Sequence, residues 1–285
     1  MKTRMAFCGA LVALFGSATV VAVGQTASGM VPANGASATF VFTTSVHTPK
    51  GKHSGSGTIT VKHIKGRSIT LTVKSDDGTT RTIPLVVGEN GTVAPDPSAP
   101  APTETSAPDA AARAFMSDVS LAAHVGIAAR KNAHASSFGV PVTLSPIGDG
   151  TPVPASLTMK GAAAGETGEY AEYTGSVSGS TMTKLPPGGG LDPATLAKTI
   201  GVGTAAHFAF GPAGRIATAV GMHHRKQQEK KAAAGLVPDD VTLNVILRLA
   251  NGQCHAIEGT QNDVVQIASK KVTIASTWSF TRSGP

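Results

Sequence analysis

The chain has 285 residues, and its 24 lysine and arginine residues against 17 aspartate and glutamate residues give a formal net charge of +7. Aromatic residues make up only 4% of the chain, so an apolar core must come mainly from Val, Ile, Leu and Ala. The two cysteines, Cys8 and Cys254, exclude a scaffold held by several disulfides. A chain of this length can form one large domain or two small ones.

The first 24 residues have the features of an export signal. Lys2 and Arg4 precede an uncharged apolar run, and Ala22 and Gly24 place small residues at −3 and −1 of a cleavage site before Gln25. The alternative, an uncleaved membrane anchor, fits this small-residue end less well. The signal predicts a secreted or periplasmic protein. Its removal takes two of the 24 basic residues and none of the 17 acidic ones, which leaves a net charge of +5.

Cleavage would leave Cys254 as the only cysteine of the mature chain, next to His255. Neighbouring side chains on a strand point to opposite faces, so these two would not meet as nucleophile and base. We therefore expect a half-buried strand thiol rather than a catalytic pair.

Residues 25–37 are expected to form a flexible N-terminal segment, and residues 38–93 a meander of about four antiparallel strands. Apolar residues alternate there with Thr and Lys, the pattern of a sheet with one dry face. Glycine-containing turns at 65–66, 76–78 and 90–91 separate the strands. The predicted strands cover 39–46, 58–62, 68–74 and 81–87.

Residues 94–109 contain five prolines and no large apolar residue, which predicts an extended, solvated linker that joins no sheet ladder. One substantial helix is predicted to follow over about 109–131. Apolar residues recur there at three- and four-residue intervals over 112–123, and Arg130 and Lys131 suit the negative pole of the helix. The narrow apolar stripe is expected to lie against a sheet.

The region 110–285 is thus predicted to be a helix followed by a β-rich segment. Residues 169–177 are expected to pair with 181–185 across a turn at Ser178-Gly179-Ser180, and Asn251-Gly252 is expected to turn the strand before it back. Further strands are predicted at 140–144, 155–159, 207–210, 216–220, 241–249 and 271–281, and a short helix at 192–199. In the last strand, one face is predicted to carry Val272, Ile274, Trp278 and Phe280.

The run 201–222 has the length of a membrane span, and its first six residues resemble a nucleotide-binding motif. His207, Pro212 and Arg215 interrupt it, so it is too polar for a spanning helix, and we expect no transmembrane helix after signal cleavage. Residues 201–206 match G-x-G-x-x-A but lack a preceding strand and a following long helix, which excludes a dinucleotide fingerprint.

Three histidines in the first meander are candidate metal ligands. Two of His47, His53 and His63 would approach across a hairpin, which makes a zinc or copper site conceivable with a third ligand. The favoured interpretation is a solvated turn at His53 and a strand end at His63.

Two charged clusters remain. The basic run 223–231 would suit an anionic surface, but a solvated loop or short helix is the favoured interpretation, and without interleaved aromatic residues it predicts no nucleic-acid binding. Glu166, Glu169 and Glu172 would provide two carboxylates for a glycosidase, yet a polar strand edge explains them better.

We therefore assign no catalytic, cofactor-binding or metal-ligating residue and expect no cofactor. The predicted fold is mainly β, a β-rich α+β protein whose antiparallel meanders form one curved sheet or two lobes with one substantial helix. The leading hypothesis is an exported cell-envelope or extracellular protein with a non-enzymatic structural or binding role. The alternatives are a carrier for a lipid or other apolar ligand, held between sheet and helix, and a hydrolase with an unrecognised site.

Overall fold

A computed structural model of the chain gives its fold as one antiparallel sheet and one helix, which confirms the mainly-β prediction. The residues that the structure describes are 29–88, 91–98, 107–132, 135–147, 149–150, 152–162, 170–184, 236–250, 253–267 and 270–284. The strands lie in a single sheet, so of the two arrangements left open by the sequence, one curved sheet is correct.

The first half of the sheet is a meander of consecutive antiparallel strands. Alternation of apolar and polar residues gives each strand one buried face, as at Phe40, Phe42 and Ile59. Gly66 and Gly78 occupy the turns with φ of 60° and 87°, a backbone conformation that glycine adopts without steric cost. The strands are β1 (Ser37–Thr48), β2 (Gly51–Lys65), β3 (Ser68–Ser75), β4 (Thr80–Val87) and β5 (Val93–Pro95).

The second half of the sheet follows the helix α1 (Ala107–Lys131) and is built the same way. In β10, Val241, Leu243, Val245 and Leu247 alternate as predicted, and each is no more than 2% exposed. The strands of this half are β6 (Ser137–Leu144), β7 (Asp149–Gly150), β8 (Val153–Ala162), β9 (Ala171–Lys184), β10 (Val237–Ala250), β11 (Gln253–Ile267) and β12 (Lys270–Ser283).

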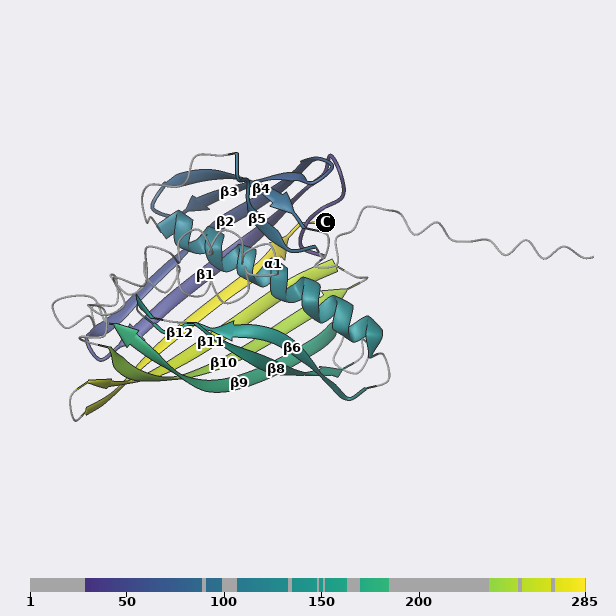
Figure 1. Cartoon of the computed structure of the whole chain (residues 1–285). Coiled ribbons are helices and arrows are strands. Elements are labelled where there is room, and N and C mark those ends of the chain that lie inside the picture. The colour runs from purple at the N-terminus through teal and green to yellow at the C-terminus, as the bar shows by residue number, and fades with distance from the viewer. Residues whose placement is uncertain are drawn as a thin grey trace, which may run out of the picture.

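The two halves join where the first strand meets the last. The strand order is β5-β4-β3-β2-β1-β12-β11-β10-β9-β8-β6, and β7 pairs with β9 away from this path. The β1–β12 pairing is antiparallel over nine residue pairs, from Thr39 with Ser283 to His47 with Ala275. Figure 1 shows the purple β1 beside the yellow β12 in the middle of the sheet.

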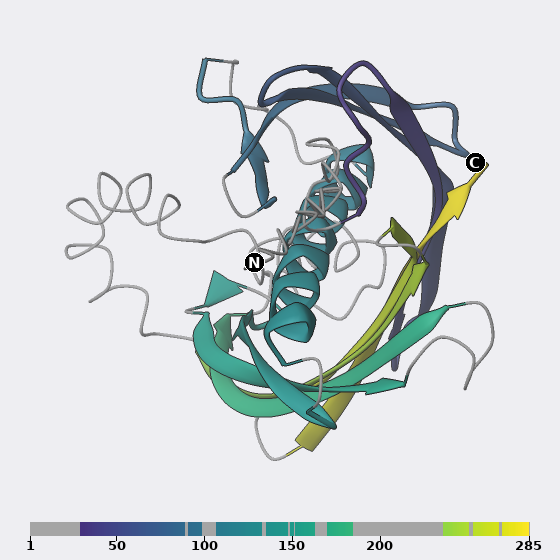
Figure 2. The same ribbon diagram turned by 90° about the vertical axis from the view of Figure 1, so that its right-hand side faces the viewer.

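The sheet curves around α1, which lies along its concave side (Figure 2). The helix connects β5 to β6, the two ends of the strand order, and contacts β3, β4 and β5 at one end and β6 at the other. The prediction of a helix over about 109–131 is confirmed. The prediction that only a narrow apolar stripe of this helix is buried is wrong. Because the sheet wraps the helix, polar Ser117, Asp118 and Ser120 are as deeply buried as its apolar residues.

Aromatic side chains connect the helix to the sheet. Phe115 of α1 contacts Phe40 of β1 and Phe280 of β12 edge-on, with ring centroids 5.1 and 5.3 Å apart. Such edge-to-face pairs are favourable beyond their buried area. Trp278 is 6% exposed and shares the concave face with Phe280 and Ile274, as predicted. A second, smaller apolar cluster is formed by Val46, Ile147, Val265 and Ile274.

The convex face of the sheet is lined by hydroxyl groups that pair across the strands. Thr43 and Ser279 join β1 to β12 over 2.8 Å, and Ser45 and Thr277 do so over 2.9 Å. On the other half, Ser178 of β9 pairs with Thr242 of β10, also over 2.9 Å. Cross-strand hydroxyl pairs of this kind stabilise a sheet face that remains in contact with water.

Three sequence-based expectations need correction. Ser178-Gly179-Ser180 is no turn, because it lies inside the continuous strand β9 and pairs with β10, Gly179 opposite Val241. The proposed linker does join the ladder at Ala94 and Pro95, which pair with β4 as an edge strand; a proline is tolerated at a sheet edge. Within the N-terminal segment expected to be flexible, Met30 is fully buried.

Several predicted features lie outside the described residues. They are the signal sequence, the short helix at 192–199 and the two strands at 207–210 and 216–220. Among the described residues, no helix has the length and apolar character needed to cross a membrane.

Candidate functional site

A pocket opens at the rim of the sheet, where β10 turns back into β11. Its volume is about 180 Å³, and it is lined by Ala250, Gln253, Cys254, His255 and Arg282. These residues come from the end of β10, the start of β11 and the end of β12. The pocket is thus formed by the terminal residues of three neighbouring strands.

A β-bulge at the start of β11 shapes this pocket. Arg248 of β10 pairs with Ala256, but the next residue, Leu249, pairs with Cys254, so His255 is an extra residue in β11. A bulge shifts the alternation of a strand and re-aims its side chains. As a result, Cys254 faces the concave side together with Leu249 and lines the pocket beside its neighbour His255.

Arg282 supplies the positive charge of the pocket. It continues the inward-facing alternation of Trp278 and Phe280 at the end of β12. Its Nη1 donates a hydrogen bond to Oε1 of Gln253 over 2.7 Å, and its guanidinium lies over the Phe40 ring, 5.5 Å from the centroid. Burial lowers the pKa of the guanidinium, which nevertheless keeps its charge in proteins.

No carboxylate pairs with Arg282 in the described part of the chain. Its hydrogen-bond acceptors are neutral: the side chain of Gln253, and the carbonyl oxygen of Gly29 at 3.2 Å from Nη2. The Nε atom is buried without a hydrogen-bond partner. The pocket therefore contains a cation whose charge is balanced by no anionic side chain among these residues.

Gly29, a few residues after the predicted cleavage site, is hydrogen-bonded to two residues of the pocket lining. The Gly29 carbonyl accepts hydrogen bonds from Arg282 and from the Cys254 backbone N–H, the latter over 3.2 Å. Met30 and Val31, at 0% and 2% exposed, then enter the core. Gly29, the first described residue, is thus held at the rim beside Arg282.

The side chains of Cys254 and His255 contact different partners. The Cys254 side chain is fully buried, not half-buried as predicted, and its Sγ donates to the Ala256 carbonyl over 3.6 Å. Burial raises the pKa of the thiol, so the thiolate needed for a nucleophile is disfavoured. The His255 ring stacks on Tyr170, with centroids 4.5 Å apart.

The three histidines considered as metal ligands are not brought together. His47 pairs with Lys52 and His53 with Val46 across the β1–β2 hairpin, so the two side chains point to opposite faces. The His63 ring nitrogens lie 2.9 and 2.8 Å from the carbonyl oxygens of Pro32 and Gly66. Among the described residues, no three His, Cys, Asp or Glu side chains are grouped as a metal would require.

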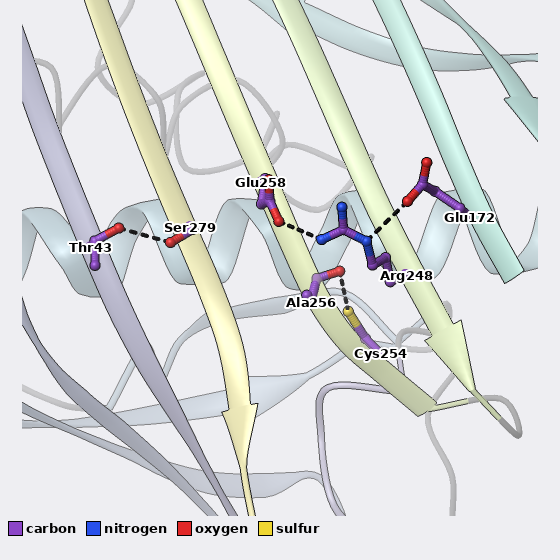
Figure 3. A network of polar contacts seen from close by, with 7 residues as sticks. All are labelled: Thr43, Glu172, Arg248, Cys254, Ala256, Glu258 and Ser279. Atoms are coloured by element: carbon purple, nitrogen blue, oxygen red, sulfur yellow. Dashed lines mark hydrogen bonds and ion pairs between the residues drawn. The ribbon is translucent and has the colours of Figure 1, made fainter. Parts of the chain in front are cut away.

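Glu172 is held by Arg248 on the convex face. Arg248 Nε donates to Oε2 of Glu172 on β9 over 3.0 Å, and its Nη1 donates to Oε1 of Glu258 on β11. Figure 3 shows Arg248 between the two glutamates, on the side of the strands away from α1. One guanidinium engages both carboxylates, so we interpret them as a cross-strand bridge within the sheet. Glu172 lies on an inner strand, not on the polar edge that we expected.

The remaining sequence candidates fall outside the described residues. These are Glu166, Glu169, the glycine-rich run 201–206 and the basic run 223–231. What these residues do stays a prediction from the sequence.

Comparisons with known proteins identify no family. No protein-family model matches the chain, and no curated protein matches it. Among solved structures, a similar chain is the outer membrane protein OprG from Pseudomonas aeruginosa, with 9% sequence identity over 87% of this chain and 94% of that chain, and a TM-score of 0.17. At this TM-score the likeness carries no argument about fold or function.

Proposed function

We propose that the protein is an exported, non-enzymatic binding protein of the cell envelope, and that its rim pocket receives the anionic group of a lipid or other apolar ligand. The observation that carries the proposal is Arg282, a cation lining a pocket with only neutral acceptors around it in the described residues. The export signal supports a place outside the cytoplasm.

The physical reason is the cost of an uncompensated charge. A partly buried guanidinium loses hydration, and a carboxylate or phosphate beside it restores the balance through charge-assisted hydrogen bonds. Among the described residues, the pocket lining offers no large apolar side chain, so we place only the charged group of the ligand in the pocket and its apolar part beyond it. A volume of about 180 Å³ is smaller than a typical pocket for a whole drug-sized ligand, so it suits a head group.

Binding is favoured over hydrolysis because the described candidates for catalysis already have structural roles. Arg248 holds Glu172, and two carbonyl groups hold the His63 ring. The Cys254 thiol is buried and protonated.

The experiment compares ligands that differ only in their head or tail. Isothermal titration calorimetry of the mature protein would use decanoate, decyl phosphate, uncharged decanol and tail-free inorganic phosphate. We expect both charged amphiphiles to bind and decanol to bind more weakly. Binding of inorganic phosphate as tight as that of decyl phosphate would identify a free anion as the ligand. Failure of every anion to bind would overturn the proposal.

Two variants of β12 give the matched control. Arg282→Gln and Lys271→Gln each remove one positive charge from the same strand, but Lys271 is exposed and far from the pocket. Arg282→Gln should weaken decanoate binding by about 10- to 100-fold, as expected for one charged hydrogen-bonding partner. Lys271→Gln should leave it unchanged; equal effects of the two variants would indicate general charge attraction.

A further inference from the structure

The guanidinium of Arg282 is held in place by its own neighbours in the fold. Its Nη1 donates to Oε1 of Gln253 over 2.7 Å, and its Nη2 donates to the Gly29 carbonyl oxygen over 3.2 Å. The central carbon of the guanidinium lies over the Phe40 ring, 5.5 Å from the centroid. Two hydrogen bonds and one ring contact orient the planar group, which reduces the entropy lost when an anion binds to it.

The contact between Gln253 and Arg282 joins two strands beyond the end of their ladder. Ala256 and Thr281 form the last residue pair between β11 and β12 at this rim. Gln253 precedes the bulge at His255, and Arg282 follows Thr281. The side-chain hydrogen bond therefore connects β11 to β12 where their backbone pairing has stopped, and both of its residues line the rim pocket.

The chemistry of Arg282 decides how the Gln253 amide is oriented. A guanidinium has only N–H donors, so the amide presents its oxygen to Arg282 and keeps its nitrogen for another partner. That nitrogen carries two N–H groups, and no hydrogen bond within the described part of the chain uses them. Gln253 is half-buried and lines the pocket. The pocket thus offers a second donor next to the guanidinium.

Arg282 has a neutral side-chain partner, in contrast to Arg248. On the convex face, Arg248 donates to the carboxylates of Glu172 and Glu258, which balance its charge. Gln253 has the shape of a glutamate but carries no charge, so it holds Arg282 in the same manner and leaves the positive charge uncancelled. A glutamate at this position would form an ion pair with Arg282 and take the place of an anionic ligand.

We propose that Gln253 determines the specificity of the rim pocket: its amide oxygen orients Arg282, and its amide nitrogen donates to the anionic head group. This inference rests on the proposed function, since it takes the head group to bind at Arg282. A carboxylate or phosphate has at least two oxygen atoms, so one accepts from the guanidinium and another from the amide. An alcohol has one uncharged oxygen, and its hydrogen bonds to these donors are weaker. Gln253 thus selects anionic over uncharged amphiphiles.

Two amide-to-carboxylate variants form the matched test. Gln253→Glu adds a negative charge beside Arg282, and Asn244→Asp adds one at an exposed position of β10, on the convex face. In isothermal titration calorimetry near neutral pH, Gln253→Glu should weaken decanoate binding by at least about tenfold, because the new ion pair replaces one charged hydrogen-bonding partner. Decanoate should then lose its advantage over decanol. Asn244→Asp should bind decanoate as the wild-type protein does.

The stability of the variant separates lost binding from lost folding. Without ligand, Gln253→Glu should unfold at a temperature no lower than that of the wild-type protein, because its carboxylate supplies the counter-charge that Arg282 lacks. Undiminished decanoate binding by the folded variant would overturn the role of Gln253. An equal loss of binding in Asn244→Asp would overturn it too, since a distant charge would then act as strongly.

Nuclear magnetic resonance of nitrogen-15-labelled glutamine side chains observes the donated hydrogen bond in the wild-type protein, whether or not Gln253→Glu folds. Decanoate should shift the Gln253 amide signals, which Gln253→Met identifies by their absence. The Gln261 signals should not move, because its amide is buried against Asp263, away from the pocket. Unmoved Gln253 signals in protein that binds decanoate would overturn this inference and leave the proposed function intact. Failure of the wild-type protein to bind any anion would overturn both.

Discussion

The indole N–H of Trp278 on β12 donates a hydrogen bond to Oδ2 of Asp118 on α1, over 3.1 Å. Both side chains are buried, at 6% and 1% exposed. A buried indole N–H needs an acceptor, and here the acceptor comes from the helix that the sheet encloses. Together with the contacts of Phe115 to Phe40 and Phe280, this bond orients α1 against the middle of the sheet.

Asp118→Asn should make stability less dependent on pH. Burial raises the pKa of Asp118 well above its usual value, while the Trp278 hydrogen bond opposes this. The folded state therefore keeps a proton that the unfolded chain releases above about pH 4, so stability falls as pH rises from there. Asparagine can still accept from Trp278 and has no proton to lose. Urea unfolding between pH 5 and 8 should give a shallower dependence of stability on pH for the variant; parallel curves would contradict this.

Trp278→Ala should cost about 3–5 kcal/mol of unfolding free energy, because it removes a large buried side chain and leaves Asp118 without its donor. Lys271→Ala, at an exposed position of the same strand, should stay within about 0.5 kcal/mol. Urea unfolding followed by circular dichroism measures both.

Trp278 is the only tryptophan in the chain, so wild-type fluorescence should be blue-shifted when folded. A water-exposed emission maximum of the folded protein would contradict its burial.

Gly259→Ala should destabilise the protein through overpacking. Gly259 of β11 lies opposite Trp278, and a Cβ at this position would come within 2.0 Å of the indole. The indole is held by Asp118 and cannot move aside freely, so a loss of about 1–3 kcal/mol is expected. Gly55→Ala is the matched control, since its nearest neighbour atom would be 3.4 Å away. The two unfolding midpoints should differ clearly; equal midpoints would show that the indole adapts.

The Cys254 thiol should be unreactive in the folded protein. Burial raises its pKa, so the thiol stays protonated at pH 8, and its side chain is closed to solvent. The mature chain should therefore release no chromophore from a disulfide reagent until urea unfolds it, and then one equivalent. Rapid reaction of the native protein would mean that the rim around Cys254 opens readily.

Alternation was enough to predict most strands and the buried position of Trp278, because one face of each strand is apolar. It failed at Ser178-Gly179-Ser180, where glycine serves packing instead of a turn: a Cβ on Gly179 would lie 2.7 Å from Leu144 Cδ1 of β6. That neighbour is distant in sequence, so the local pattern favoured a hairpin. The start of β11 was likewise obscured by its bulge at His255, which breaks the alternation there.

Two inward-facing charged residues had a weaker signal within the same alternation. Arg282 continues the inward-facing series of Trp278 and Phe280, and Asp239 continues that of Val241 backward along β10. A charged residue in an otherwise apolar series is a candidate for function, because its burial needs compensation.

The pairing of β1 with β12 has a consequence for how the chain reaches its native state. Thr43 and Ser279 are neighbours in space but 236 positions apart in sequence, so the inner edge of the N-terminal meander has no partner until the last strand is available. Contacts of such separation form slowly, and an open edge meanwhile invites pairing with other chains. A polypeptide that emerges N-terminus first can assemble β1 to β5 early, yet it completes its sheet only when its tail arrives. Under the export that we propose, this order would delay folding until translocation is almost finished.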